Sequence, residues 1–184
     1  MEKGEGGIWD YTIRASKDLL MKPGYEPPSR EAPYGKFFGR PMTGRDFRIN
    51  GSVDVGPGKE AAVVIDDQKQ AELREAYKLL LNRTGSRISL RYLDEKKALI
   101  DVLGVSRELI PYDEKYTKKI DKKYTDQKIE LAMYIGKGGV CRQQGLLAGY
   151  LIEKLIADRH LDGKVSIERN WKKGKGGHQW VRYI

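Results

Sequence analysis

The stretch that most constrains this chain lies at residues 136–160, where a glycine-rich turn runs directly into a long amphipathic segment. Gly-Lys-Gly-Gly-Val-Cys-Arg occupies 136–142, and large apolar residues then recur at Leu147, Tyr150, Leu151, Leu155 and Ile156. Apolar residues three and four positions apart predict a helix over 141–160 with one buried face. Cys141, the single cysteine of the chain, therefore lies at the predicted start of this helix.

A pair of strands is predicted after the helix. Residues 164–170 alternate in polarity, with Arg169 on the same side as two apolar residues, and 178–184 also has the pattern of a strand. A second Gly-Lys-Gly-Gly quartet at 174–177 separates the two segments. This arrangement predicts an antiparallel hairpin, with His178 at the start of its second strand.

The segment before the helix predicts further α and β elements. The alternation over 46–55 and the apolar run at 61–65 predict two strands. Apolar residues at helical spacing predict a helix over 67–83, started by Asp66 or Asp67 and stopped by Gly85.

Two further segments lie between that helix and the glycine-rich turn. A helix is predicted over 92–103, ended by Gly104. Residues 111–127 are rich in Lys, Asp and Tyr, which predicts a solvated connection with a helical turn or two. Residues 46–184 are thus expected to form one α+β domain.

Residues 1–45 are expected to form an extended arm laid over this domain. Proline and glycine recur through 23–41 too often for long elements, although a short helix is predicted around 14–21. Four aromatic residues are expected to anchor the arm: Tyr25, Tyr34, Phe37 and Phe38.

The composition indicates which cellular compartment and which binding partners to expect. No stretch approaches the roughly 18 consecutive apolar residues of a membrane span. A single cysteine forms no internal disulfide, which favours the reducing cytoplasm. The net charge of +9 leaves nucleic acid open as a partner, especially at the basic segment 164–184, but no recognisable nucleic-acid module accompanies that charge.

Cys141 and His178 suggest nucleophilic chemistry. A thiolate forms more readily at a helix N-terminus, where N–H groups and the helix dipole point at the sulfur. An imidazole beside it can activate the sulfur and then protonate the leaving group. Taken singly, a lone cysteine is more often a small buried residue. Two such residues, each beside a glycine turn, favour acyl transfer through a thioester.

These motifs resemble a known superfamily over about residues 128–184. Gly-Gly-Val-Cys-Arg-Gln-Gln-Gly, followed by a strand and Gly-Gly-His-Gln-Trp-Val-Arg-Tyr, is similar to the transglutaminase-like superfamily of papain-type cysteine enzymes. Its bacterial and plant branch reads Gly-Val-Cys-Arg and then Gly-Gly-His-Ala-Trp. The resemblance implies an α+β fold with the catalytic helix packed on an antiparallel sheet, Cys141 as nucleophile and His178 as base.

The resemblance also implies a third residue, an aspartate on the following strand. The chain ends at Ile184, before such a position. We therefore expect a longer natural protein, an incomplete triad, or another residue that orients the imidazole. Asn170, on the preceding strand, is the nearest substitute by topology, while Asp162 and Glu168 are weaker ones.

Four residues are predicted to contact substrate: Gly139, Arg142, Trp180 and Tyr134. For Trp180 a place in the core is an equal alternative, and for Tyr134 a packing role competes. Cys141, His160 and His178 are spaced too poorly for a zinc site, so no metal and no organic cofactor is expected. His160 at a helix C-terminus is explained by the helix dipole.

Three functions follow from the sequence. The first is cysteine-dependent acyl transfer on amide bonds of a peptide or protein substrate, as hydrolysis or as transfer. The second is a binding domain that retains the fold, is weakly active or inactive, and uses its basic C-terminal surface. The third is association with nucleic acid. The sequence predicts neither the substrate nor the oligomeric state.

Overall fold

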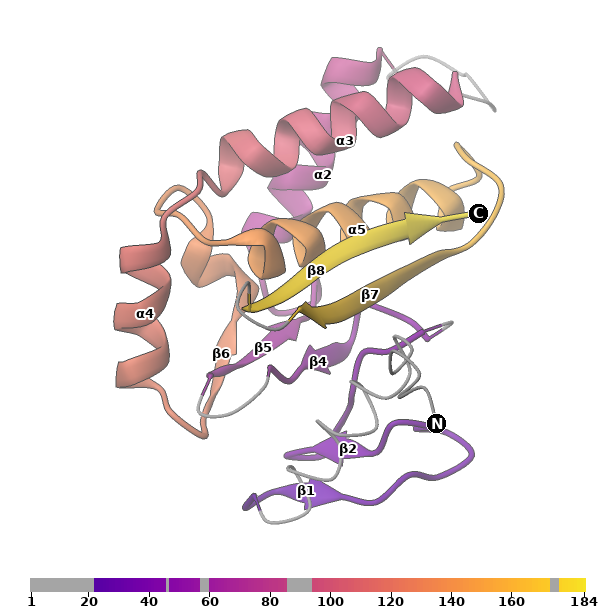
Figure 1. The fold of residues 1–184 in the computed structure, drawn as a ribbon. Helices are drawn as coiled ribbons and strands as arrows, with labels where there is room; N and C mark the ends of the chain where they lie inside the picture. The colour runs from indigo at the N-terminus through magenta and orange to yellow at the C-terminus, as the bar shows by residue number, and fades with distance from the viewer. Residues whose placement is uncertain (1–21, 46, 57–59, 86–93, 173–175) are drawn as a thin grey trace, which may run out of the picture.

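The computed structural model describes residues 22–45, 47–56, 60–85, 94–172 and 176–184, and their architecture is mixed α+β. Figure 1 shows helix α5 (Cys141–Ala157) at the centre. The hairpin of β7 (Val165–Lys172) and β8 (Gly176–Tyr183) packs along one side of α5, and α2 (Ala71–Thr84) and α3 (Glu95–Leu109) lie on another.

Helix α5 is buried along most of its length because its apolar residues face the hairpin and the helices α2 and α3. Leu146, Leu147, Tyr150, Leu151 and Leu155 are all fully buried in the main core. A side chain at Gly149 would meet the Cδ1 atoms of Ile49 and Ile167 at 2.8 Å each. The absence of a Cβ there lets the hairpin lie close against the helix.

Strands β7 and β8 form an antiparallel hairpin, as predicted. Asn170 pairs with His178, and Arg169 pairs with Gln179. Side chains alternate across the two faces, so Arg169 and Gln179 lie on the face toward α5, with Ile167 and Val181. His178 and Trp180 lie on the opposite face of the strand.

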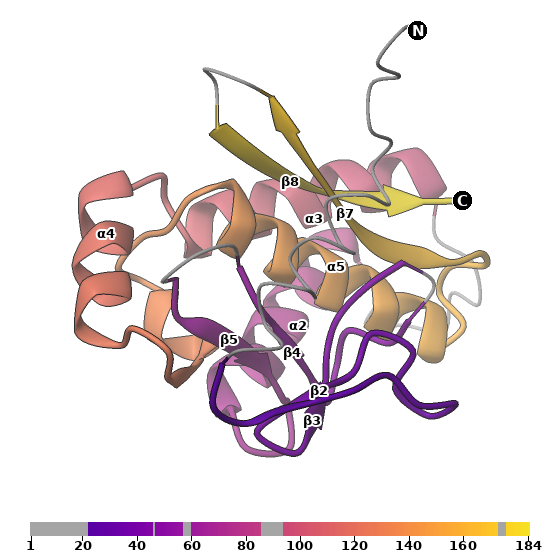
Figure 2. The ribbon, with the colours of Figure 1, turned by 60° about the horizontal axis from the view of Figure 1, so that its bottom comes forward.

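A second, mixed sheet lies below α5 (Figure 2). Strand β5 (Ala62–Ile65) is antiparallel to β4 (Ser52–Asp54) and parallel to β6 (Lys128–Glu130). The connection from β5 to β6 contains α2, α3 and α4 (Glu114–Lys123). The short helix η1 (Leu131–Tyr134) and a glycine loop then lead from β6 into α5.

The N-terminal part of the described chain forms a small antiparallel sheet of β1 (Tyr25–Glu26), β2 (Lys36–Phe37) and β3 (Arg40–Pro41). A second apolar cluster joins it to β4 and β5. Of the predicted anchors, Phe37 is buried in this cluster and Tyr25 and Tyr34 pack against it, whereas Phe38 is 40% exposed. The helix predicted at 14–21 lies outside the described residues.

Several predicted element boundaries were wrong. Helix α3 continues through Gly104 to Leu109, and α2 begins at Ala71 after Gln70, not after an aspartate. The predicted solvated connection at 111–127 contains the ten-residue helix α4, whose N-cap Asp113 accepts a hydrogen bond from the Tyr116 N–H at 2.8 Å. Gly85 does end α2, in the left-handed conformation with φ of 74°.

None of the helices in the described part of the chain is both long enough and apolar enough to cross a membrane.

Candidate functional site

A pocket of about 120 Å³ opens beside the N-terminus of α5. It brings together Cys141 and His178, which are far apart in the sequence. Its other walls come from α4, from β7 and from the segment around Gly56 and Glu60.

Cys141 is the first residue of α5 and is half-buried with a free thiol. The preceding residue, Val140, has an extended backbone and donates its N–H to the Gln143 side-chain oxygen at 3.0 Å. The helix therefore starts abruptly at the cysteine. The first turn of a helix presents N–H groups that have no acceptor within the helix, and these favour negative charge nearby.

His178 reaches the same pocket from β8 but is exposed. Its ring stacks on the Trp180 ring, with the centroids 5.9 Å apart and the planes at 24°. Among the hydrogen bonds of the described residues, none joins Cys141 to His178. Both residues thus line one pocket, while the imidazole stacks on Trp180 on the face of β8 that is opposite α5.

A buried ionic network forms the floor of this region. Asp54 is fully buried, and its Oδ2 accepts a hydrogen bond from Arg142 Nε at 2.7 Å. Arg142 also donates to the Asp54 backbone carbonyl at 2.8 Å, and Arg169 is ion-paired with Asp54 Oδ1. Thr43 Oγ1 donates to that same carboxylate oxygen at 2.8 Å. One carboxylate therefore links β4, the first turn of α5 and the hairpin.

Gln179 connects this network to both candidate catalytic residues. Its side-chain oxygen accepts a hydrogen bond from Arg169 Nε at 2.9 Å, and its amide nitrogen donates to the backbone carbonyl of Arg142 at 3.3 Å. Because Arg142 follows Cys141 and Gln179 follows His178, this amide bridges the two chain segments that deliver the thiol and the imidazole.

Two residues with carboxyl groups, Glu60 and Asp121, also line the pocket. Glu60 pairs with Arg142 at 3.1 Å, and Asp121 accepts a hydrogen bond from the backbone N–H of Ala61 at 3.1 Å. Burial raises the pKa of Glu60, and this effect outweighs the lowering by Arg142. The pocket lining therefore combines two carboxyl groups with the guanidinium groups of Arg142 and Arg169.

The residues predicted to contact substrate lie in different surroundings. Arg142 lines the pocket but is engaged by Asp54 and Glu60. Trp180 is half-buried beside His178. Tyr134 is fully buried in the main core, edge-on to Tyr116 with ring centroids 6.0 Å apart, and burial raises its pKa.

Gly139 is buried, and the structure gives a packing reason for it. A Cβ at this position would meet Ile110 Cγ2 and Gln143 Cβ at 2.8 Å each. Gly138 has φ of 130°, which side chains rarely adopt, and a Cβ there would meet Asp113 Cβ at 2.7 Å. The glycines let the loop pass close to the chain between α3 and α4, so the space beside them is filled by protein and not open to a substrate.

Asn170 lies directly across the hairpin from His178 in the backbone register, as the topology predicted. Its side chain lies outside the described part of the structure. Elsewhere among the described residues, no three His, Cys, Asp or Glu side chains gather in the way that would hold a metal ion.

The sequence did not predict that Asp54, Arg169 and Gln179 connect the elements around the site. One signal was present, since Arg169 alternates with apolar residues and therefore faces the core side of its strand. An arginine at such a position requires a buried acidic or carbonyl partner. No comparable signal marks Asp54 as buried.

Comparisons with known proteins find no match to this chain. A scan against models of protein families finds no match, and searches of curated proteins and of solved structures find none either.

Proposed function

We propose that this chain is a cysteine-dependent acyl-transfer domain with a transglutaminase-like, papain-type core. The observation that carries the proposal is the shared pocket of Cys141 and His178, with Cys141 at the first position of the buried helix α5. Supporting it, the antiparallel hairpin packs along that same helix and delivers His178 near the start of β8.

In the proposed reaction, the Cys141 thiolate attacks the carbonyl carbon of a substrate amide. A carbon–sulfur bond forms, the carbon–nitrogen bond breaks, and the amine leaves with a proton from the His178 imidazolium. Water or a second amine then attacks the thioester, His178 takes its proton, and sulfur leaves as thiolate. The substrate is a peptide or protein, and neither reaction step requires a cofactor.

N–H groups of the first turn of α5 are the available donors to the oxyanion formed on the substrate. Loss of one such donor costs about 3–4 kcal/mol of transition-state stabilisation in enzymes where it has been measured. Asn170, opposite His178 in the ladder, is the proposed orienting residue for the imidazole. Such a partner accelerates the reaction, and residual catalysis persists without it.

The test is to trap the acyl group. The protein is incubated with a mixture of peptides and hydroxylamine, and peptide hydroxamates are sought by mass spectrometry. Hydroxylamine intercepts a thioester whether water or an amine is the natural acceptor. Hydroxamates that form with the native chain and are lost in Cys141→Ala, with an unchanged melting temperature, support the proposal. Equal yields with both proteins would contradict it.

A second function is favoured by one observation. His178 is exposed and stacked on Trp180, and the two arginines beside the pocket are engaged by the buried carboxylate of Asp54. A binding domain that retains the fold without turnover is consistent with this arrangement. Cys141→Ala separates the two functions, because it removes turnover from an enzyme and leaves the affinity of a binding domain unchanged.

A further inference from the structure

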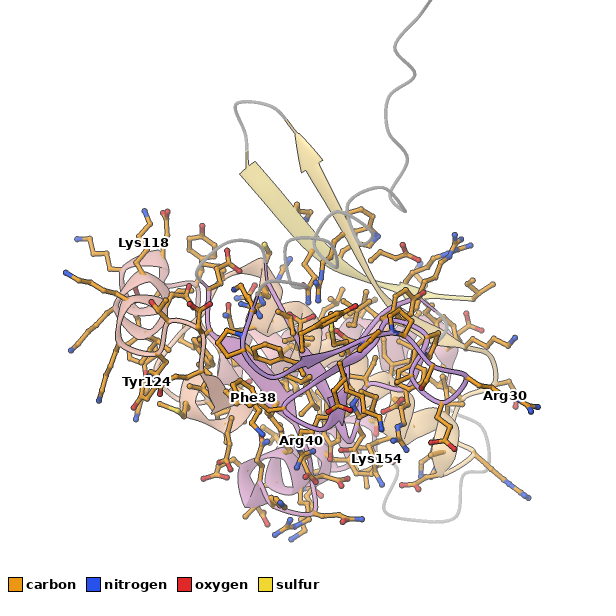
Figure 3. The ribbon with its side chains drawn as sticks, turned by 90° about the horizontal axis from the view of Figure 1, so that it is seen from below. Arg30, Phe38, Arg40, Lys118, Tyr124 and Lys154 are labelled. Atoms are coloured by element: carbon orange, nitrogen blue, oxygen red, sulfur yellow. The ribbon has the colours of Figure 1, made fainter. Side chains whose placement is uncertain are left out.

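Helix α4 carries a stripe of lysines along its outer surface. Six of its residues are exposed, namely Glu114 and the five residues that we call the α4 lysine stripe: Lys115, Lys118, Lys119, Lys122 and Lys123. Steps of three and four residues place these lysines on one face of the helix. Figure 3 shows Lys118 at the edge of the molecule, directed away from the core.

Repulsion between the lysines of the stripe destabilises the helix. Like charges three and four positions apart repel one another along a helix. Lys122 and Lys123 complement the helix dipole at the C-terminal end, but Lys115 lies in the first turn, where a cation is unfavourable. Glu114 offsets part of the charge through its contact with Lys118 at 2.7 Å. A negatively charged partner from outside would relieve the remaining repulsion.

The stripe lies beside the pocket that contains Cys141. Thr117 and Asp121, on the inner side of α4, line that pocket. The chain that enters α4 is also hydrogen-bonded to the loop that leads to Cys141. The Asp113 N–H donates to the Gly139 carbonyl at 2.8 Å, and the Gly139 N–H donates to the Pro111 carbonyl at 2.9 Å. A polypeptide that leaves the pocket over α4 therefore passes the lysines.

We propose that the α4 lysine stripe is the docking surface for an acidic segment of the polypeptide substrate, next to the amide bond that Cys141 attacks. This inference rests on the proposed function. Charge complementarity defines the partner. A polypeptide is favoured over nucleic acid for two reasons. The cations of the stripe are all lysines, and it has no arginine guanidinium to bind phosphate in a bidentate manner. The adjoining pocket is proposed to act on amides.

The test uses the full chain and a fluorescein-labelled oligoglutamate, with a Gly-Ser peptide as the neutral reference, followed by fluorescence anisotropy. One variant changes all five stripe lysines to glutamine. Its matched control changes five other exposed cations to glutamine: Lys69, Lys96, Lys97, Arg107 and Lys164. Each variant lowers the net charge from +9 by five, to +4. We expect oligoglutamate affinity to fall about tenfold in the stripe variant and less than about threefold in the control.

Equal weakening in both variants would overturn the inference, because bulk charge would then explain the binding. A single-stranded oligonucleotide that binds more tightly than oligoglutamate at the same salt, and loses affinity in the stripe variant, would also overturn it in favour of nucleic acid. If the stripe variant does not fold, Lys118→Gln with Lys119→Gln is compared with Lys96→Gln with Lys97→Gln, and a larger loss is expected in the first pair.

The failure of this inference differs from the failure of the proposed function. Cys141→Ala is expected to bind oligoglutamate as well as the native chain, because it leaves α4 unchanged. If no acyl group can be trapped while the stripe still binds oligoglutamate selectively, the acyl-transfer proposal fails and the stripe remains a docking surface for acidic polypeptide, without a role in placing an amide at Cys141. If an acyl group is trapped and the two charge variants bind alike, only the docking surface fails.

Discussion

Asp54→Asn removes a charge that two buried arginines share, and it tests whether the ionic network holds the pocket together. Asp54 is fully buried, and the side chains of Arg142 and Arg169 are 8% and 12% exposed. Asparagine keeps the shape but removes the buried negative charge that both guanidinium groups face, although Arg142 keeps its contact with Glu60 at 3.1 Å. Removing one partner of a buried ion pair costs about 3–5 kcal/mol. One kcal/mol shifts the melting temperature of a chain this size by about 2–4 °C, so a decrease of about 6–20 °C is expected.

Thermal and urea unfolding followed by circular dichroism measure this loss. The matched control is Glu75→Gln, since Glu75 contacts Lys78 at 2.7 Å on the surface, where the two side chains are 67% and 65% exposed. An exposed pair contributes about 0–1 kcal/mol. A loss in Asp54→Asn that is no larger than the loss in the control would refute the reasoning that the network stabilises the fold.

Three further predictions test the packing and electrostatics of the site. Gln179→Met removes the amide bridge between β8 and α5. Because one hydrogen bond contributes about 1 kcal/mol, alkylation of the cysteine thiol near pH 6 is expected to be about fivefold slower. Gln144→Met loses a comparable 2.8 Å amide–carbonyl bond that does not involve β8, and should leave that rate unchanged. Gly149→Ala is expected to destabilise the fold by about 1–3 kcal/mol through overpacking, as measured by urea unfolding. Gly145→Ala, whose new Cβ would have no neighbour nearer than 3.8 Å, should stabilise it by up to about 1 kcal/mol. Because burial raises the pKa of Glu60, the stability of the fold should fall as the pH rises above 4.5, the ordinary pKa of a glutamate. The melting temperature of Glu60→Gln should therefore rise relative to that of the native chain between pH 4 and pH 7, and a fall in this difference would contradict the prediction.

The elements with strong periodicity could be predicted from the sequence. The start of α5 at Cys141 and the β7–β8 hairpin were confirmed, because apolar residues at helical spacing and alternating residues each leave a clear pattern. Helix α4 was underestimated for the converse reason. Only Thr117 and Ile120 are buried in it, so its apolar pattern is too short to stand out among lysines.

Tertiary contacts determined what local pattern could not. Gly104 has the character of a helix stop, yet α3 continues through it and buries Val102 and Val105 on either side. Asp54 has the alternation of a half-exposed strand residue, but Arg142 and Arg169 arrive from distant segments and allow its complete burial. No spacing rule within one segment predicts a partner that lies 88 residues away.

The measurement that tests the central claim most directly is the pH dependence of iodoacetamide alkylation of Cys141, in the native chain and in His178→Ala. The account predicts alkylation that is already fast near pH 6 in the native chain, and a profile that is slower and shifted to alkaline pH when the imidazole is removed. A midpoint near 8.5, the value of an ordinary thiol, in both proteins, or no labelling in either, would contradict a thiol activated by His178.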